Sequence, residues 1–373
     1  MAFTGKAQQW LFSALDSLTY PDSWLSGRFS DFDLWCAHAR SCLSEALGLL
    51  PAPVPFDVEI LSEEDRGSYT ATLLAFCVDT AYQTQAYLLM PHGRGPFPAI
   101  VALHDHGAFF LWGKEKLVCS PLAHHPALAE HVSRHYGGRF IADELAKRGY
   151  AVIAVDQWLW GEKRVSDIPG ADKLDLNTRD GVLAYNALAA DLERQISFAM
   201  IFAGRSMPGQ MLFADRRALD LLLQDKRVDA ERVACIGLSM GGFRSIHLAA
   251  MDDRIRAAVE IGWMCALTSY LRYHDHLYRW PNIIGLCTPG LARHLDFPDV
   301  ASLICPRPLL MMAGRLDELY PTVSVQEAFA KIEAVYRSQG VSDRVEGRWY
   351  DVPHCFDVSM QEHAFGWLDR WLS

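Results

Sequence analysis

The sequence has little of what would mark a protein that binds nucleic acid or a membrane surface. Lys and Arg number 35 against 45 Asp and Glu, which gives a formal net charge of −10. Polyanions and anionic membranes are recognised by clustered basic residues, and this chain spreads its Lys and Arg thinly. We therefore expect a small, uncharged or cationic ligand, with neither nucleic acid nor a membrane as partner.

Long apolar runs and paired cysteines are also missing. No stretch approaches the roughly 18 apolar residues that a membrane span requires, and polar residues interrupt positions 1–18, where a signal peptide would be apolar. The nine cysteines are odd in number and include no C-x-x-C pair. This pattern predicts reduced, mostly buried thiols in a cytoplasmic protein.

The remaining composition is that of an ordinary globular protein, with 50% hydrophobic and 21% charged residues among 373. Apolar side chains at helical spacing, followed by a proline-rich stretch at 51–55, predict a helical N-terminal extension over residues 1–54. Residues 55–373 would form one large domain. A partly helical, lid-like insertion is expected at about 158–225, with 263–298 as a second candidate.

The main domain alternates strand and helix patterns. Residues 56–91 predict three strands that pair antiparallel at one edge of a sheet. Further short apolar strands are then separated by helical stretches, at 99–104, 151–156, 233–237, 256–262, 308–314 and 345–351. Strands that are apolar on both faces predict an α/β fold with a mostly parallel sheet covered on both sides. A ligand would bind at the carboxyl ends of these strands.

One motif in this pattern carries chemistry. Residues 237–241 read GLSMG, directly after a predicted strand and before a predicted helix. This context is typical of a nucleophile elbow, in which a sharp turn exposes a serine hydroxyl above the sheet and the glycines avoid steric collision. Ser239 is thus the candidate nucleophile, and the rival interpretation is a passive serine in a glycine-rich turn.

A serine nucleophile needs a general base and an orienting acid. His354 follows the last predicted strand and Asp317 follows the strand before it, so both would lie at the same sheet edge as Ser239. Glu318 and Glu260 remain as fallbacks for the acid. The oxyanion formed in acyl transfer also needs amide donors. These would be Met240, directly after the nucleophile, and His106 in the loop after strand 99–104, with Gly107 in reserve.

The order Ser239, Asp317, His354 in these strand contexts resembles the α/β-hydrolase superfamily over residues 56–373. The segments HDHGAFFLWGKEK and DFPDVASLICPRPLLMMAGRLDELYP resemble bacterial esterases grouped near dienelactone hydrolases and acetyl xylan esterases. Dienelactone hydrolases proper use a cysteine nucleophile, where this chain has Ser239. The resemblance implies an α/β-hydrolase fold and a serine esterase. It fixes neither the N-terminal segment nor the insertion, so it implies no particular substrate.

Two weaker signals concern metals and substrate binding. The His-Asp-His segments at 104–106 and 274–276, and the pair His131 and His135 on one helix face, read like metal ligands but complete no metal motif. We therefore expect no metal and no cofactor. Large aromatic residues follow the predicted strand ends and are candidates for substrate binding, although core or lid packing is the rival role: Trp112, Trp158, Trp160 and Trp263.

The expected activity is hydrolysis of small to medium carboxylic esters through an acyl-enzyme. Short acyl chains should be preferred, because Phe109, Phe110 and the tryptophans crowd the predicted strand ends. A carbohydrate esterase with acetyl or cinnamoyl substrates, a serine peptidase and an acyltransferase remain alternatives on the same fold. A non-catalytic binding module is the rival from another class. The partner is a small ester, and both a monomer and a homo-oligomer stay open.

Overall fold

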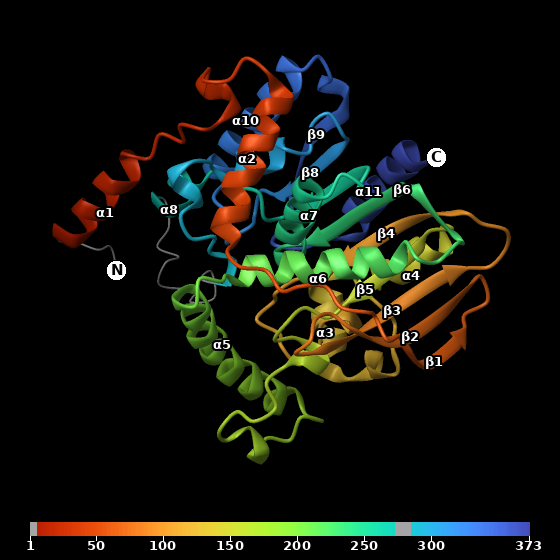
Figure 1. Cartoon of the computed structure of the whole chain (residues 1–373). Coiled ribbons are helices and arrows are strands. Elements are labelled where there is room, and N and C mark those ends of the chain that lie inside the picture. Colours follow the sequence, from red (N-terminus) through yellow and green to blue (C-terminus); the bar gives the residue numbers. More distant parts are fainter. Residues whose placement is uncertain (1–5, 273–284) are drawn as a thin grey trace.

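The computed structural model describes residues 6–272 and 285–373. They hold one mixed sheet of nine strands in the order β1-β2-β3-β5-β4-β6-β7-β8-β9 (Figure 1). The strands are β1 (Glu59–Asp65), β2 (Tyr69–Cys77), β3 (Gln83–Pro91), β4 (Phe97–Leu103), β5 (Ala151–Val155), β6 (Val228–Leu238), β7 (Ala257–Ile261), β8 (Leu309–Gly314) and β9 (Val345–Tyr350).

The sheet has the antiparallel edge and the parallel body that the sequence predicts. Strands β1, β2 and β3 pair antiparallel, and β3 joins β5 antiparallel. From β5 to β9 every neighbouring pair is parallel. Every residue of β5, β7 and β8 is buried, as expected for strands covered on both faces. The α/β class is therefore confirmed.

Helices cover both faces of the sheet. One layer, on the near face in Figure 1, includes α6 and α7, and α9 and α10 continue the same series of packed helices. On the other face, α4 contacts β5 while α11 contacts β6 and β7. Tyr150, directly before β5, donates to Asp369 at 2.7 Å, and this hydrogen bond links the start of β5 to α11. The bounds are α4 (Ile141–Lys147), α6 (Met207–Leu222), α7 (Met240–Met251), α9 (Phe297–Ser302), α10 (Thr322–Ser338) and α11 (Val358–Leu372).

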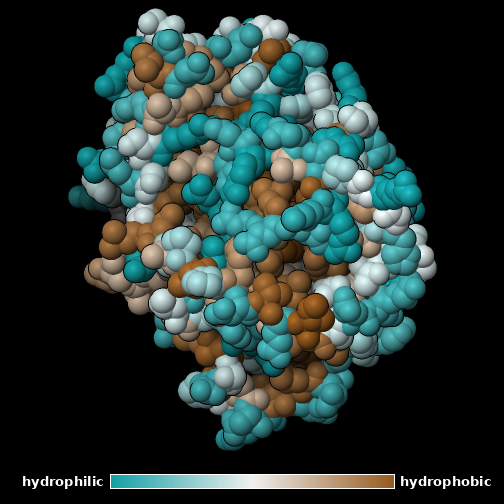
Figure 2. Space-filling model, turned by 45° about the vertical axis from the view of Figure 1, so that its right-hand side comes forward, coloured by the Kyte–Doolittle hydropathy of each residue, from teal (hydrophilic) through white to brown (hydrophobic). Residues whose placement is uncertain are grey.

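The segment 158–225 divides into two parts. Helix α5 (Arg179–Phe202) extends away from the sheet in Figure 1, and the lower part of the surface in Figure 2 carries apolar patches. Helix α6, by contrast, packs against α7, β4 and β5 and buries most of its residues. A lid interpretation therefore suits at most the part before α6, because α6 belongs to the helical layer of the fold.

The N-terminal residues contribute two helices, α1 (Lys6–Asp16) and α2 (Phe32–Leu47), before β1 begins. Helix α2 packs against α6, and α1 contacts α8 (Leu267–Arg272). The remaining long helix, α3 (Pro126–Tyr136), lies between β4 and α4 in the chain. No helix within residues 6–272 and 285–373 is both long and apolar enough to cross a membrane.

Candidate active site

Ser239 occupies a strained turn between β6 and α7. Its backbone has φ of 59° and ψ of −119°, a left-handed region that residues with a side chain rarely adopt. The Ser239 amide donates to the carbonyl of Ile261 at 2.7 Å, which ties the turn to the end of β7. Such strain persists only where surrounding contacts hold it, and it presents the serine at the start of a helix.

The two motif glycines are required by close backbone contacts. A Cβ added to Gly237 would lie 2.4 Å from the carbonyl carbon of Gly241, and one added to Gly241 would lie 2.0 Å from the carbonyl oxygen of Leu103. Real Cβ atoms do not approach other atoms so closely. The elbow therefore packs directly against the end of β4, where the candidate oxyanion loop begins.

His354 and Asp317 meet as the sequence order suggests. Asp317 Oδ2 lies 2.6 Å from His354 Nδ1, and the Asp317 side chain is only 4% exposed. Because the carboxylate accepts a hydrogen bond, Nδ1 carries the proton and Nε2 is left as the acceptor. Asp317 Oδ1 accepts from the Leu319 amide at 2.8 Å, which fixes the carboxylate within its own loop.

The loops after β8 and β9 are bonded to each other, which explains how this pair forms. The amides of Arg315 and Leu316 donate to the carbonyls of Tyr350 and Val352, at 2.7 and 3.1 Å. A Cβ on Gly314 would lie 2.3 Å from the Val352 carbonyl oxygen, so only glycine allows this contact. These contacts hold the loop that carries Asp317 against the loop that carries His354.

The His354 ring lies over the end of β7, beside the elbow. A Cβ added to Gly262 would be 3.4 Å from both Nδ1 and Cε1 of His354 and 3.5 Å from a methyl carbon of Leu238. Leu238 directly precedes Ser239. The geometry therefore brings the imidazole to the residues that flank the candidate nucleophile.

The two fallback acids have other environments. Glu318 is exposed, and Glu260 is completely buried within β7. Glu260 Oε1 accepts from the amides of Trp263 and Met264, so it shapes the turn that leaves β7. Burial raises the pKa of Glu260 to about 8. Its hydrogen bonds go to that turn, whereas Asp317 is the acid bonded to His354.

The candidate oxyanion donors are the backbone amides of Met240 and His106. Met240 is the first residue of α7, where amides have no partner within the helix. For His106, the preceding carbonyl of Asp105 accepts from Lys116 Nζ at 2.8 Å. A trans peptide points its N–H opposite to its C=O, so the His106 amide points away from buried Lys116. The His106 carbonyl accepts from Lys116 and Trp160, at 3.1 and 3.3 Å. By the same argument the amide of Gly107 points away from these two donors.

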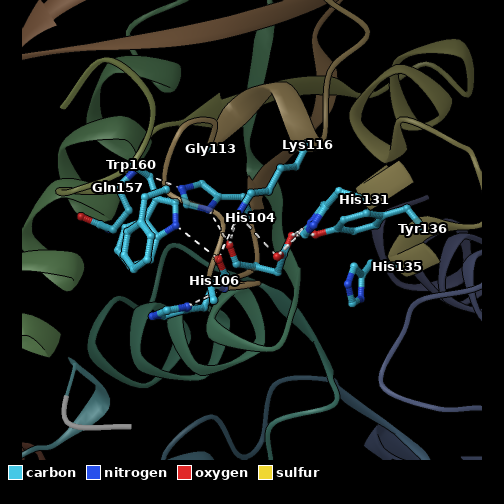
Figure 3. A network of polar contacts seen from close by, with 12 residues as sticks. His104, His106, Gly113, Lys116, His131, His135, Tyr136, Gln157 and Trp160 are labelled. Atoms are coloured by element: carbon cyan, nitrogen blue, oxygen red, sulfur yellow. Dashed lines mark hydrogen bonds and ion pairs between the residues drawn. The ribbon is translucent and has the colours of Figure 1, made fainter. Parts of the chain in front are cut away.

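A buried polar network supports this loop (Figure 3). Asp105 accepts from Tyr136 at 2.6 Å and from His131 at 3.1 Å, and Lys116 Nζ lies 3.4 Å from its carboxylate. Burial would raise the pKa of Asp105, but Lys116 and His131 outweigh burial and hold the pKa well below its ordinary value. Asp105 is thus a buried anion that anchors both α3 and the loop. Sequence reasoning missed Asp105, Lys116 and Tyr136.

The His106 side chain is bonded to the insertion. Its Nε2 lies 3.0 Å from both carboxylate oxygens of Glu193 in α5, and its Nδ1 accepts from the Ala108 amide at 3.0 Å. Nδ1 is therefore unprotonated and Nε2 donates to Glu193. Glu193 is 1% exposed. This contact joins α5 to the candidate oxyanion loop, and nothing in the sequence near Glu193 indicates it.

The other described histidines considered as metal ligands make hydrogen bonds to protein groups. His104 accepts from the Gln157 amide at 3.1 Å, and burial, with Arg244 nearby, holds its pKa well below the ordinary value. His131 binds Asp105, while His135 Nδ1 lies 3.2 Å from the His354 carbonyl. His274 and His276 fall outside the described residues.

The four predicted substrate-binding tryptophans have different surroundings. Trp160 is fully buried and stacks on Phe110 with 4.8 Å between ring centroids. Trp112 is 6% exposed and packs near His125, and Trp158 is half-buried. Trp263 lines an apolar cavity of about 410 Å³. The cavity is also lined by Cys265, Leu267, Tyr270, Leu286, Phe297 and Tyr320.

Tyr320 places this cavity near the histidine. Its ring stacks on the His354 imidazole with 5.9 Å between centroids, and the Tyr270 ring stacks on Tyr320 with 5.6 Å between centroids. Tyr320 thus contacts both the cavity and the His354 imidazole. Aromatic stacking of this kind also limits how far the imidazole can turn.

Comparison with known proteins identifies the class. A model of the Abhydrolase family matches residues 114–351, so the chain belongs to that family and is a hydrolase of the α/β-hydrolase superfamily. It is 28% identical over 341 residues to a Bacillus subtilis (strain 168) protein named "Putative hydrolase YtaP". The match covers 90% of this chain and 99% of that protein.

Solved structures of esterases share the fold. A "putative acetyl xylan esterase" of Bacteroides fragilis NCTC 9343 superposes with a TM-score of 0.70 at 19% identity, over 94% of this chain and 83% of that one. A glucuronoyl esterase of Solibacter usitatus gives 0.59 at 15%, over 91% and 92%. An acetyl xylan esterase of Paenibacillus sp. R4 gives 0.54 at 15%, over 92% and 95%. At these identities the likeness concerns the fold alone.

Proposed function

We propose that the protein is a serine esterase that hydrolyses small to medium carboxylic esters through a covalent acyl-enzyme. The single observation that carries the proposal is the 2.6 Å contact between Asp317 and His354 at the sheet edge where Ser239 occupies its strained turn. These three residues supply the nucleophile, base and acid that acyl transfer requires.

The proposed reaction has two stages. Ser239 Oγ attacks the ester carbonyl while His354 Nε2 takes its proton, and the imidazolium then returns that proton to the leaving alcohol. Asp317 orients the ring and stabilises the imidazolium. The amides of Met240 and His106 hold the oxyanion. Water attacks the acyl-enzyme in the second stage, again with His354 as base, and releases the acid and free Ser239.

We further propose a preference for short acyl chains. Phe109 and Phe110, close to the candidate oxyanion loop, are 6% and 1% exposed. Side chains packed this closely cannot easily move aside for a long acyl chain. The apolar cavity behind Tyr320 offers space to a larger alcohol group. A panel of esters that varies the acyl and alcohol parts separately assigns the cavity to one of them.

A second candidate is a carbohydrate esterase. It is favoured by the structural neighbours, two of which are named as acetyl xylan esterases and one as a glucuronoyl esterase. The serine peptidase and acyltransferase alternatives would use the same three residues with an amide substrate or an alcohol acceptor. A cytoplasmic location is proposed from the nine cysteines, all of which are free.

The experiment is a rate panel with p-nitrophenyl esters from acetate to decanoate, alongside sugar acetates, cinnamoyl esters and an aminoacyl anilide. We expect rates to be highest from acetate to butyrate and to fall beyond roughly six carbons, because a methylene that does not fit costs more than the ~0.8 kcal/mol that a fitting one gains. Dominant turnover of sugar acetates would favour the carbohydrate esterase. A steady rise to decanoate would contradict the short-chain preference, and turnover of the anilide alone would contradict the esterase.

A further inference from the structure

A cluster of metal-ligating side chains lies outside the candidate active site. Asp22, in the loop after α1, has a side chain only 4% exposed. Its Oδ2 lies 2.7 Å from His294 Nδ1, and its Oδ1 lies 3.3 Å from His38 Nε2 and also binds Arg28. Three separate parts of the chain thus converge on one buried carboxylate.

Cys42 completes this cluster from the same helix as His38. The two residues are one turn apart on α2, and Cys42 Sγ lies 3.5 Å from His38 Nε2. The ligand atoms of Asp22, Cys42 and His294 all lie within 4.8 Å of one another. Within residues 6–272 and 285–373, this is the one group of three or more Cys, His or carboxylate side chains so placed.

We propose that Asp22, Cys42 and His294, with His38 as fourth ligand, bind a zinc ion. Zinc takes four ligands in tetrahedral geometry from thiolate sulfur, imidazole nitrogen and carboxylate oxygen, and structural sites use all four positions. The cluster offers one sulfur, two nitrogens and one oxygen. His38 is not part of the group whose ligand atoms all lie within 4.8 Å of one another, so its ring must move to become the fourth ligand; the His38 and His294 side chains are 39% and 38% exposed.

Arg28 is compatible with this arrangement. Asp22 has two carboxylate oxygens, so one binds the ion while Oδ1 keeps its bond to Arg28. Metal-binding carboxylates are commonly held in this way by a second hydrogen bond.

The site would fasten the N-terminal helical segment to the main domain. Asp22 and Cys42 precede the sheet, whereas His294 lies 272 residues after Asp22 and directly follows a short turn, Leu291–Arg293. Gly290 and Leu291 line the apolar cavity. A zinc ion would thus stabilise both α2 and one wall of that cavity. These ligands are far apart in the sequence and form no local motif, so the sequence pattern does not indicate the site.

The test uses full-length protein that has been stripped with a chelator and dialysed. We expect it to take up one equivalent of Zn²⁺ and to show a thermal midpoint that rises with Zn²⁺ concentration. Co²⁺ in place of Zn²⁺ should give tetrahedral d–d absorption together with a thiolate-to-cobalt charge-transfer band.

Two variants and a matched control assign the signal. Cys42→Ser should lose the charge-transfer band, and His294→Asn should weaken uptake at least tenfold. Cys36→Ser changes another buried cysteine of α2 that is outside the cluster, and it should behave as wild type. Substoichiometric uptake by wild type, or uptake unchanged in both cluster variants, would overturn the proposal and leave a hydrogen-bonded cluster around Asp22. Neither readout depends on esterase activity.

Discussion

Replacing Lys116 with methionine should lower kcat for ester hydrolysis and leave KM nearly unchanged. Lys116 is fully buried, and its ammonium donates to the carbonyls of Asp105 and His106, at 2.8 and 3.1 Å. Methionine has nearly the same length as lysine but no hydrogen-bond donor. The carbonyls of Asp105 and His106 would therefore lose the contact that orients the His106 amide. Loss of one oxyanion donor typically costs 10²–10³ in kcat, or about 3–4 kcal/mol. We expect Lys116→Met to lose about this much kcat with KM nearly unchanged.

The same change also destabilises the fold, which calls for a control. Lys116→Met leaves Asp105 as a buried carboxylate without its ammonium, a defect that costs about 3–5 kcal/mol. Tyr136→Phe removes the 2.6 Å hydrogen bond to Asp105, at about 1–3 kcal/mol, but leaves both carbonyl contacts of Lys116 in place. This control should therefore lower stability with only a few-fold change in kcat.

The assay is steady-state hydrolysis of p-nitrophenyl acetate, with urea denaturation to measure the free energy of unfolding. Rates are compared at a temperature at which both variants are folded. If Lys116→Met keeps kcat within a few-fold of wild type, the contacts of Lys116 do not aim an oxyanion donor. If both variants lose kcat in proportion to their loss of stability, the network acts only through folding.

Three further predictions follow from the packing and from the buried histidines. Gly241→Ala would place a Cβ 2.0 Å from the Leu103 carbonyl, so it should lower the melting temperature and abolish turnover, whereas Gly366→Ala on α11, with open space, should not; equal melting temperatures would contradict this. Burial lowers the pKa of His135 and of His247 to about 4, so the unfolded chain binds more protons than the folded protein between about pH 6.5 and 4. The free energy of unfolding should therefore fall as the pH is lowered through this range. Urea titrations at several pH values should show this slope, and His247→Phe should reduce it. A chelator should leave acetate ester turnover intact at a temperature at which the stripped protein stays folded, because the proposed catalytic residues use no metal; loss of turnover by the folded protein, restored by a divalent ion, would refute that.

The sequence predicts the elements that depend on local pattern. Strands such as β5 and β8 are short apolar runs between helices, and the GLSMG turn needs only its flanking strand and helix to be recognised. Strand β1 is harder to place, because the strand pattern begins at residue 56 and β1 spans Glu59–Asp65. All its residues are exposed at the sheet edge, so no alternation of polar and apolar residues marks its position.

The parts of the site that escape prediction depend on distant contacts. Lys116 lies in a charged stretch, and only its hydrogen bonds to carbonyls of the neighbouring loop make it a core residue. Glu193 meets His106 across 87 residues of sequence, and His294 meets Asp22 across 272. No periodicity encodes such pairs. The position of Asp317 after β8 favours it as the acid. Only the contacts in the folded protein distinguish it from Glu260, because Asp317 is bonded to His354 and Glu260 is bonded to the turn after β7.

The measurement that tests the central proposal most directly is covalent labelling with a fluorophosphonate, mapped by mass spectrometry. The proposal predicts one label, on Ser239, with loss of ester turnover in step with labelling. Ser239→Ala should take up no label and lose on the order of 10⁶ in kcat, because the three residues act as a unit. A folded Ser239→Ala protein that keeps strong ester turnover, or a wild-type protein labelled on another residue as activity is lost, would contradict it.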